Sequence, residues 1–273
     1  MSARPVDTAP APVTLASLMD MKARGEKFAC LTAYDASFAR LLDDAGVEVL
    51  LVGDSLGMVI QGRESTLPVT LDEMVYHTAC VRRGRRRALI MSDMPFMSDA
   101  TPPLTLDNAA RLMRAGAHMV KIEGGEVMAD TIRCLSGRGI PVCAHLGLLP
   151  QSVHKLSGYR VQGRDTSSAR RILEDAAAVA AAGADMLLLE CVPASLADEV
   201  VATVKVPVIG IGASGACDAQ VLVSYDMLGL SSGHRPRFSK NFLTGRDSVQ
   251  AAVEDYVQAV KSGRFPASEH LYT

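Results

Sequence analysis

Four short apolar runs in this chain each end on a carboxylate, and these acids are the residues whose types and spacing point most directly to chemistry. The runs are VEVLLVGD, RALIMSD, MVKIE and MLLLE, and they end at Asp54, Asp93, Glu123 and Glu190. Such runs are typical of buried parallel strands, and α/β folds bind their ligands beyond the carboxyl ends of those strands. Four carboxylates that meet there repel one another unless a cation or a proton shares the site. The pattern therefore predicts a metal-assisted enzyme.

The residue types indicate which metal and which partners to expect. Asp54, Asp93 and Glu123 supply hard oxygen ligands, which suit Mg²⁺ with open positions for water or substrate oxygens. Lys121 precedes Glu123 by two residues, so both point to the same side of a strand, where a lysine can pair with a substrate carboxylate. His145 ends another apolar run, and it could either hydrogen-bond the substrate or be a buried structural histidine.

Each acid could instead cap the helix that follows its strand. Aspartate is a preferred N-cap residue because its side chain accepts hydrogen bonds from the first backbone N–H groups of a helix. For one acid alone the two interpretations are evenly balanced, but four together are hard to explain as caps. Asp35, which ends LTAYD without a partner motif, fits the cap better.

Apolar strand-like runs alternate with helical segments along the whole chain. The expected strands are FACLTA, VEVLLVG, RALIMS, HMVKI, IPVCAH, DMLLLE and VPVIGIG, with a weaker eighth near residues 227–230. Seven or eight βα units in about 250 residues match the size of a closed (β/α)8 barrel. A doubly wound open sheet is the alternative. GIGASG at 210–215 matches the glycine pattern of dinucleotide-binding folds, but too few residues follow it for the remaining strands.

Composition argues against several other classes of protein. The net charge of −2 gives no general attraction to nucleic acids or membranes, and the basic run at residues 82–87 predicts a solvated helix end. No uncharged stretch is long enough to span a membrane, and six widely spaced cysteines predict neither a zinc site nor disulfides. Residues 1–13 predict a disordered leader, followed by a single barrel domain over 14–273. A cytoplasmic enzyme is the resulting expectation.

Eight motifs together resemble one known family. They are VGDSLGM (52–58), STLPVTLDEMVYHT (65–78), DMPFM (93–97), AGAHMVKIEGG (115–125), PVCAHLGLLPQSV (141–153), GYRVQGR (158–164), LLLECVP (187–193) and PVIGIGAS (207–214). They resemble the ketopantoate hydroxymethyltransferases, which make ketopantoate for pantothenate biosynthesis. The resemblance runs from Leu15 to the C-terminal helix, and VGDSLGM and VKIEGG at this separation are highly specific.

The resemblance implies a fold, an assembly and a metal site. The fold is a (β/α)8 barrel of the phosphoenolpyruvate/pyruvate type with an N-terminal helix. The assembly is a homo-oligomer, often a decamer. The metal is Mg²⁺, held by Asp54 and Asp93, with Glu123 in or near its coordination shell.

The resemblance also implies the substrates and a base. The 2-oxoacid 3-methyl-2-oxobutanoate would contact Ser55 and Lys121 as well as the two aspartates, and 5,10-methylenetetrahydrofolate would be the second substrate. Glu190 matches the family's proton acceptor, which removes the C3 proton that the metal acidifies. The chain departs from the family in one region: Ser214 and Ala219 stand where glycine is usual. This departure bears on the conformation of a late loop and on folate contacts.

Two other functions compete with this one. A Mg²⁺-dependent 2-oxoacid lyase of the same barrel type would cleave a C–C bond, but that class usually has a cysteine in a mobile loop over its site. No cysteine of this chain has a comparable setting. A non-catalytic barrel that serves as an assembly scaffold would be expected to have lost some of the site acids, and none is lost.

Overall fold

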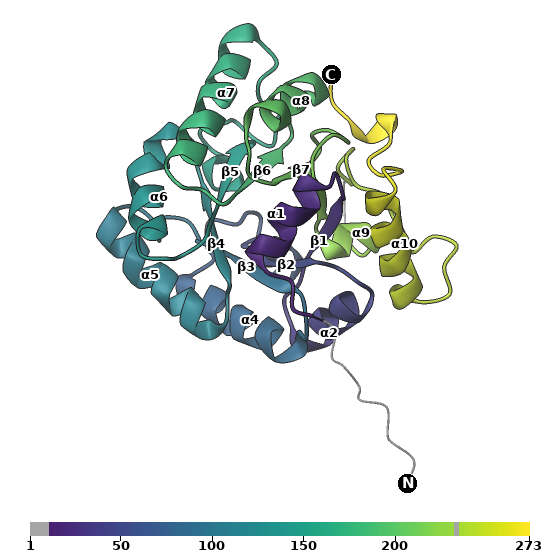
Figure 1. The fold of residues 1–273 in the computed structure, drawn as a ribbon. Coiled ribbons are helices and arrows are strands. Elements are labelled where there is room, and N and C mark those ends of the chain that lie inside the picture. Colours follow the sequence, from purple (N-terminus) through teal and green to yellow (C-terminus); the bar gives the residue numbers. More distant parts are fainter. Residues whose placement is uncertain (1–10, 232–234) are drawn as a thin grey trace.

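The computed structural model describes residues 11–231 and 235–273, and these residues form a closed barrel of eight parallel strands surrounded by helices (Figure 1). The strands follow one another around the barrel in chain order, and β8 pairs with β1 to close it. They are β1 (Phe28–Thr32), β2 (Val49–Val52), β3 (Leu89–Asp93), β4 (Met119–Glu123), β5 (Val142–Gly147), β6 (Met186–Glu190), β7 (Val208–Ile211) and β8 (Ala219–Leu222). The predicted (β/α)8 barrel is confirmed, and the open-sheet alternative is wrong.

Helices separate most successive strands and cover the outside of the barrel (Figure 1). The described helices are α1 (Leu15–Ala23), α2 (Ala36–Asp44), α3 (Leu56–Val59), α4 (Leu71–Gly84), α5 (Pro102–Ala115), α6 (Ala129–Ser136), α7 (Thr166–Ala181), α8 (Ala194–Thr203), α9 (Ser224–Met227) and α10 (Val249–Lys261). Three short 3₁₀ turns accompany them: η1 (Glu126–Met128), η2 (Pro150–Ser152) and η3 (Ser268–His270).

The strands are buried on both faces, so their residues alternate between two hydrophobic cores. Leu50 and Val52 belong to the core between the strands and the outer helices, whereas Val49 and Leu51 belong to the core inside the barrel. This double burial explains why the sequence shows continuous apolar runs instead of alternation.

Helix α1 closes the N-terminal end of the barrel. Its Leu18 is fully buried in the inner core with Phe28, the first residue of β1. Lys22 forms an ion pair of 2.8 Å with Asp218, the residue before β8. The opposite end, at which every strand finishes, is therefore the end available for a site.

The eighth strand lies earlier than the sequence pattern predicts. Residues near 227–230 were the expected location, but Met227 ends helix α9 and β8 covers Ala219–Leu222. The strand is short, and its apolar run is interrupted by Gln220, a polar residue that is nevertheless buried. The Gln220 amide donates to the backbone oxygen of Ser214 at 2.9 Å, which offsets the cost of burying it. That detail of the prediction is wrong because a buried, satisfied glutamine looks like a surface residue in the sequence.

Most of the expected leader, residues 1–13, lies outside the described residues. Residues 11–14 have no regular secondary structure, and α1 begins after Thr14, which forms a capping box with Ser17. In the two described ranges, no helix has both the length and the apolar character needed to cross a membrane.

The basic run ends α4 as predicted, and a buried carboxylate organises the turn that follows. Asp43 is 4% exposed and accepts hydrogen bonds from the backbone N–H groups of Arg86, Arg87 and Ala88. The Arg86 side chain is exposed, whereas that of Arg87 folds back to within 3.5 Å of Asp43. The aspartate thus fixes the path of the chain into β3.

We expect Asp43→Ala to lower the free energy of unfolding by about 3 kcal/mol, because it leaves buried backbone donors without an acceptor. Urea denaturation followed by circular dichroism measures the change. Asp44→Ala is the matched control: its side chain is 46% exposed and lies 3.9 Å from Arg86, so it should change stability by less than about 0.5 kcal/mol. Equal stability of the two variants would contradict the role given to Asp43.

Candidate active site

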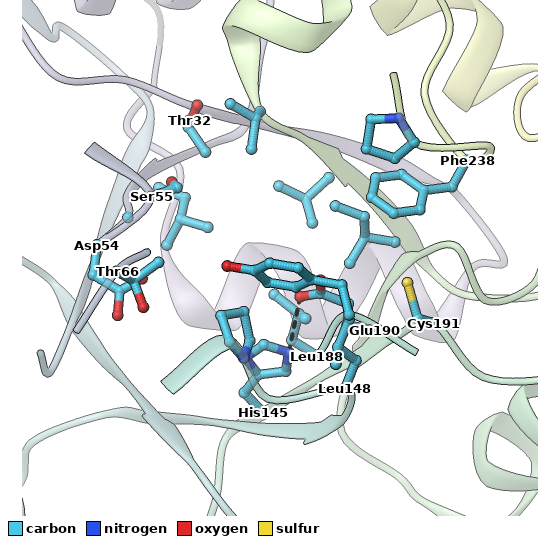
Figure 2. Close-up of a pocket in the computed structure, with 18 of the residues that line it drawn as sticks. Thr32, Asp54, Ser55, Thr66, His145, Leu148, Leu188, Glu190, Cys191 and Phe238 are labelled. Carbon is cyan, nitrogen blue, oxygen red and sulfur yellow. Dashed lines mark ion pairs between the residues drawn. The ribbon is translucent and has the colours of Figure 1, made fainter. Parts of the chain in front are cut away.

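The side chains singled out from the sequence line one pocket at the carboxyl end of the barrel. They are Asp54, Ser55, Asp93, Lys121, Glu123, His145 and Glu190. Asp93, Glu123 and Glu190 are the last residues of their strands, and Asp54 lies two residues beyond β2. Figure 2 shows Asp54 and Ser55 on one side of the pocket and the neighbouring pair His145 and Glu190 on another. The structure therefore brings all of the predicted residues together.

These four acids are not helix caps in the described structure. The N-cap residues of the helical segments that follow them are Ser55, Thr101, Gly125 and Pro193. Asp35, in contrast, accepts hydrogen bonds from two backbone N–H groups in the first turn of α2, as predicted. The capping explanation is correct for Asp35 and wrong for the site acids.

The centre of the cluster is held by Lys121. Its ammonium nitrogen lies 3.1 Å from Asp93 Oδ1 and 4.0 Å from Glu123 Oε1. Asp93 Oδ2 accepts a hydrogen bond of 3.0 Å from the backbone N–H of Asp54, which joins the ends of β2 and β3. Burial opposes the charge on Lys121, but the carboxylates of Asp93, Glu123 and Asp54 outweigh it and raise the pKa of the lysine. Lys121 is therefore a permanent cation in this site.

His145 connects the cluster to Glu190. Its Nε2 atom lies 3.2 Å from Glu190 Oε2, and its Nδ1 atom lies 3.5 Å from Glu123 Oε1 and 3.3 Å from Lys121 Nζ (Figure 2). Burial and Lys121 act to lower the pKa of His145, but the two carboxylates outweigh them and raise it. The sequence left open whether His145 contacts the substrate or is a buried structural residue. In the structure it is buried and bridges two site carboxylates, Glu123 and Glu190.

The cluster carries an excess of negative charge. Four carboxylates face Lys121 and His145, so two negative charges remain even when the imidazole is protonated. Burial, followed by the charges of Asp93 and Glu123, raises the pKa of Asp54 well above its ordinary value. In the absence of a cation, Asp54 therefore tends to keep a proton, and a divalent cation would balance the excess.

The donor atoms fit a cation that brings further ligands of its own. Asp93 Oδ1 and Glu123 Oε1 are buried and accept no well-directed hydrogen bond, although the Lys121 ammonium group lies near both. Within residues 11–231 and 235–273, however, no three His, Cys, Asp or Glu side chains are arranged so that they could hold a metal ion by themselves. This combination suits Mg²⁺, which is usually bound by one or two carboxylates with water and substrate oxygens in its remaining positions.

Gln151 is a residue of the site that the sequence did not single out. It lies in η2, within the motif at 141–153, and is not among the residues that line the pocket. Its Nε2 atom donates to Asp54 Oδ2 at 2.8 Å, and its backbone N–H donates to Glu123 Oε2 at 3.0 Å. The only signal in the sequence was its position shortly after β5, since a loop at that end of a barrel borders the site.

The rest of the pocket is largely apolar. The cavity has a volume of about 670 Å³, and its walls include Leu51, Met58, Leu148, Tyr159, Leu188, Ile211, Val221, Pro236 and Phe238. Ser55 stands at the boundary between the polar floor and these walls, and its hydroxyl lies 2.9 Å from that of Tyr34. Such a pocket has room for an apolar group above the charged cluster.

Cys191 also lines the pocket, directly after Glu190. Its backbone is left-handed, with φ of 48°, which is a strained conformation for a residue other than glycine and is found most often at functional sites. Burial raises the pKa of its thiol, so it is neutral and a poor nucleophile. Its place at a strand end, and not in a long loop, agrees with the expectation that no cysteine resembles the lyase cysteine.

The two departures from the family pattern lie away from the pocket. Ser214 is buried in the β7–β8 loop, where its hydroxyl donates to Asp198 on α8 and accepts from the backbone N–H of Ala216. Ala219 begins β8 and packs in the inner core. Neither residue is among those that line the cavity.

Known proteins with similar sequences share one name. The family model for ketopantoate hydroxymethyltransferase matches residues 12–268. The 3-methyl-2-oxobutanoate hydroxymethyltransferase of Marinobacter nauticus is 60% identical over 260 residues, which cover 95% of this chain and 98% of that protein. That of Nitrosococcus oceani is 61% identical over 261 residues, with coverage of 95% and 99%.

Solved structures with the same fold are much more distant in sequence. A phosphonopyruvate hydrolase in complex with oxalate and Mg²⁺ superposes with a TM-score of 0.60 at 12% identity, over 93% of this chain and 99% of that one. A 2,3-dimethylmalate lyase of the phosphoenolpyruvate mutase/isocitrate lyase superfamily superposes with a TM-score of 0.58 at 18% identity, over 81% and 84%. These likenesses show the barrel fold, and the sequence match establishes the family. The chain belongs to the ketopantoate hydroxymethyltransferase family.

Proposed function

We propose that this chain transfers a hydroxymethyl group from 5,10-methylenetetrahydrofolate to 3-methyl-2-oxobutanoate and so forms 2-dehydropantoate (ketopantoate) for the synthesis of pantothenate and coenzyme A. One observation carries the proposal: a chain that matches the family over residues 12–268 has every expected acid in a single pocket. Relatives that are 60% and 61% identical to this chain carry the name of this activity. A lyase or a non-catalytic scaffold would not account for that match.

The proposed roles follow from the charge and position of each side chain. Asp54 and Asp93 would hold Mg²⁺, with Glu123 in or near its coordination shell, and the metal when bound would polarise the 2-oxoacid and acidify its C3 proton. Lys121 would face the substrate carboxylate with a permanent positive charge. Glu190, on the far side of His145 from the other acids, would accept the C3 proton as general base.

Ser55 and His145 would complete the oxoacid site. Among the described residues the Ser55 hydroxyl has one hydrogen-bond partner, the hydroxyl of Tyr34, and a hydroxyl has the capacity to bond a substrate oxygen as well. His145 keeps Glu190 beside the cluster and, when protonated, can also donate to a substrate oxygen through either ring nitrogen. No covalent enzyme nucleophile is needed in this scheme.

The size of the pocket supports a two-substrate reaction. The oxoacid has about eight non-hydrogen atoms and, at roughly 30 Å³ for each water-sized group, would fill less than half of the cavity. The remaining volume of the 670 Å³ cavity is lined by apolar and aromatic side chains, including Tyr159 and Phe238. A flat folate ring would find contacts of that kind favourable.

The wider organisation is part of the same proposal. We infer one domain over residues 14–273, a homo-oligomer, often a decamer in this family, and a place in the cytoplasm. Val127 and Tyr76 are exposed apolar side chains outside the pocket, 88% and 64% exposed, and they are candidates for subunit contacts. Light scattering coupled to size-exclusion chromatography measures the number of subunits.

The enolisation half-reaction gives a direct test of the function. We expect the enzyme with Mg²⁺ to exchange the C3 proton of 3-methyl-2-oxobutanoate for deuterium in D₂O without folate, because the base and the metal need no second substrate. Proton NMR follows the loss of the C3 signal, and an EDTA-treated sample is the control. Absence of exchange above that control would contradict the proposed function.

A further inference from the structure

Gln151 connects the ends of three successive strands. Its side-chain amide donates to Asp54 Oδ2 at 2.8 Å, just beyond β2, and to the backbone oxygen of Met94 at 2.9 Å, just beyond β3. Its backbone N–H donates to Glu123 Oε2 at 3.0 Å, at the end of β4. Among the described residues, Lys121 and Gln151 each contact the carboxylate of Glu123 and that of another proposed metal-binding acid, Lys121 through its side chain and Gln151 through its backbone and side chain together.

The two hydrogens of the amide are both used, so the side chain has a fixed orientation. One hydrogen goes to Asp54 and the other to a main-chain oxygen that belongs to the barrel. An amide fixed in this way contacts one oxygen of Asp54, Oδ2. The other oxygen, Oδ1, makes no contact with Gln151. Glu123 is held in a similar way: its Oε2 atom accepts a hydrogen bond from the backbone N–H of Gln151, while Oε1 accepts none from the residues that the structure describes.

We propose that Gln151 is a positioning residue for the cation site, an inference that rests on the proposed function. It holds one oxygen of Asp54, so that the other oxygen of this carboxylate would be left for the cation. Groups that orient metal-binding carboxylates without touching the metal commonly contribute 10- to 100-fold to metal affinity. Gln151 does not line the cavity, so it is not a catalytic residue.

Gln151 belongs to the loop between β5 and α7, so it connects this loop to the carboxylates of the site. That loop also carries Tyr159, which lines the pocket and whose hydroxyl lies 3.6 Å from the sulfur of Met58 across its mouth. Gln162 near the end of the loop offers a matched control: its amide donates only to Arg160 in the same loop and makes no contact with the site acids. The two glutamines share residue type and loop but differ in what they touch.

The test compares the Mg²⁺ affinity of Gln151→Ala, Gln151→Met and Gln162→Ala with that of the wild type. Calorimetric titration with Mg²⁺ alone should show a Kd raised roughly 10- to 100-fold in both Gln151 variants and unchanged in Gln162→Ala. Methionine retains the length and packing of the side chain, so it serves if alanine disturbs the loop. Thermal unfolding without Mg²⁺ should give similar midpoints for all four proteins.

Activity adds a second readout. The Mg²⁺ concentration that gives half-maximal activity should rise with the Kd, while kcat at saturating Mg²⁺ returns toward the wild-type value. If Gln151 only stabilised the fold, its substitution would lower the unfolding midpoint and leave Mg²⁺ affinity unchanged. If the wild type binds Mg²⁺ and Gln151→Met binds it within twofold as well, this inference is wrong and the proposed function stands. If the wild type does not bind Mg²⁺, the proposed cation site is wrong and the inference is overturned with it.

Discussion

Asp54→Asn should lower turnover by roughly 10³-fold or more, because it removes a charged ligand from a site expected to supply several kcal/mol of metal stabilisation. Asparagine keeps the shape of the side chain and can still accept the hydrogen bond from Gln151, so the loss would come from charge. Steady-state kinetics at several Mg²⁺ concentrations measure the effect. Asp35→Asn is the control, since asparagine caps α2 as well as aspartate does.

The same substitution should have the opposite effect on stability without metal. The raised pKa of Asp54 means that the folded protein binds this proton more tightly than the unfolded chain does, whose carboxyl has a pKa of about 3.9. Stability is therefore lost as pH rises from the unfolded pKa through the folded one, and asparagine avoids that loss. In EDTA at neutral pH, Asp54→Asn should unfold at the wild-type temperature or above it.

Added Mg²⁺ separates the two proteins further. At 100 times its Kd, Mg²⁺ should stabilise the wild type by about 2.7 kcal/mol and the variant by much less. Near-normal activity of Asp54→Asn at modest Mg²⁺, or equal stabilisation of both proteins by the metal, would remove Asp54 from the metal site.

The positions of the site acids were predictable because strand ends are visible in a sequence. A parallel strand buried on both faces is an unbroken apolar run, so the carboxylate that ends it is conspicuous, as at Asp93, Glu123 and Glu190. A closed barrel then brings all strand ends into one ring, whatever their separation in the chain. The apolar runs and their spacing therefore sufficed for the four acids, Lys121 and His145, while the family resemblance supplied Ser55, the role of Glu190 and the substrates.

Contacts that depend on the path of a loop were not predictable in this way. Gln151 reaches Asp54 and Glu123 only because η2 turns the chain back over the strand ends, and no periodicity encodes that turn. The β8 strand was misplaced for a related reason: whether Gln220 is buried depends on a partner from the preceding loop, the backbone of Ser214. Sequence patterns indicate which segments are buried, but not which buried polar groups find partners.

The relation between Glu190 and the other acids is set by backbone geometry at two strand ends. Gly147, with φ of 88°, ends β5 where a Cβ atom would lie 2.3 Å from the backbone oxygen of Glu190. A side chain at this position would push β5 and β6 apart, and His145 would then lose its 3.2 Å approach to Glu190. The glycine thus keeps Glu190 close to the cluster, with the imidazole between Glu190 and Glu123.

Glu190→Gln should leave binding of Mg²⁺ and 3-methyl-2-oxobutanoate intact but slow C3 proton exchange by roughly 10²–10⁴-fold, the usual contribution of a general base. Glutamine keeps the shape of the side chain and can still hydrogen-bond His145, so only the basicity is lost. Proton NMR in D₂O measures exchange, and calorimetry measures binding of metal and oxoacid. Glu199→Gln, an exposed change on α8, is the control.

Two results would contradict these roles in different ways. Exchange by Glu190→Gln at the wild-type rate would mean that another group removes the proton, and His145, 3.2 Å from Glu190, would be the first candidate. Loss of Mg²⁺ binding in the same variant would make Glu190 a ligand and not a base. The observation that favours the base is its separation from the other carboxylates: the His145 ring lies between it and Glu123, whereas Asp54 and Asp93 are joined directly by a hydrogen bond of 3.0 Å.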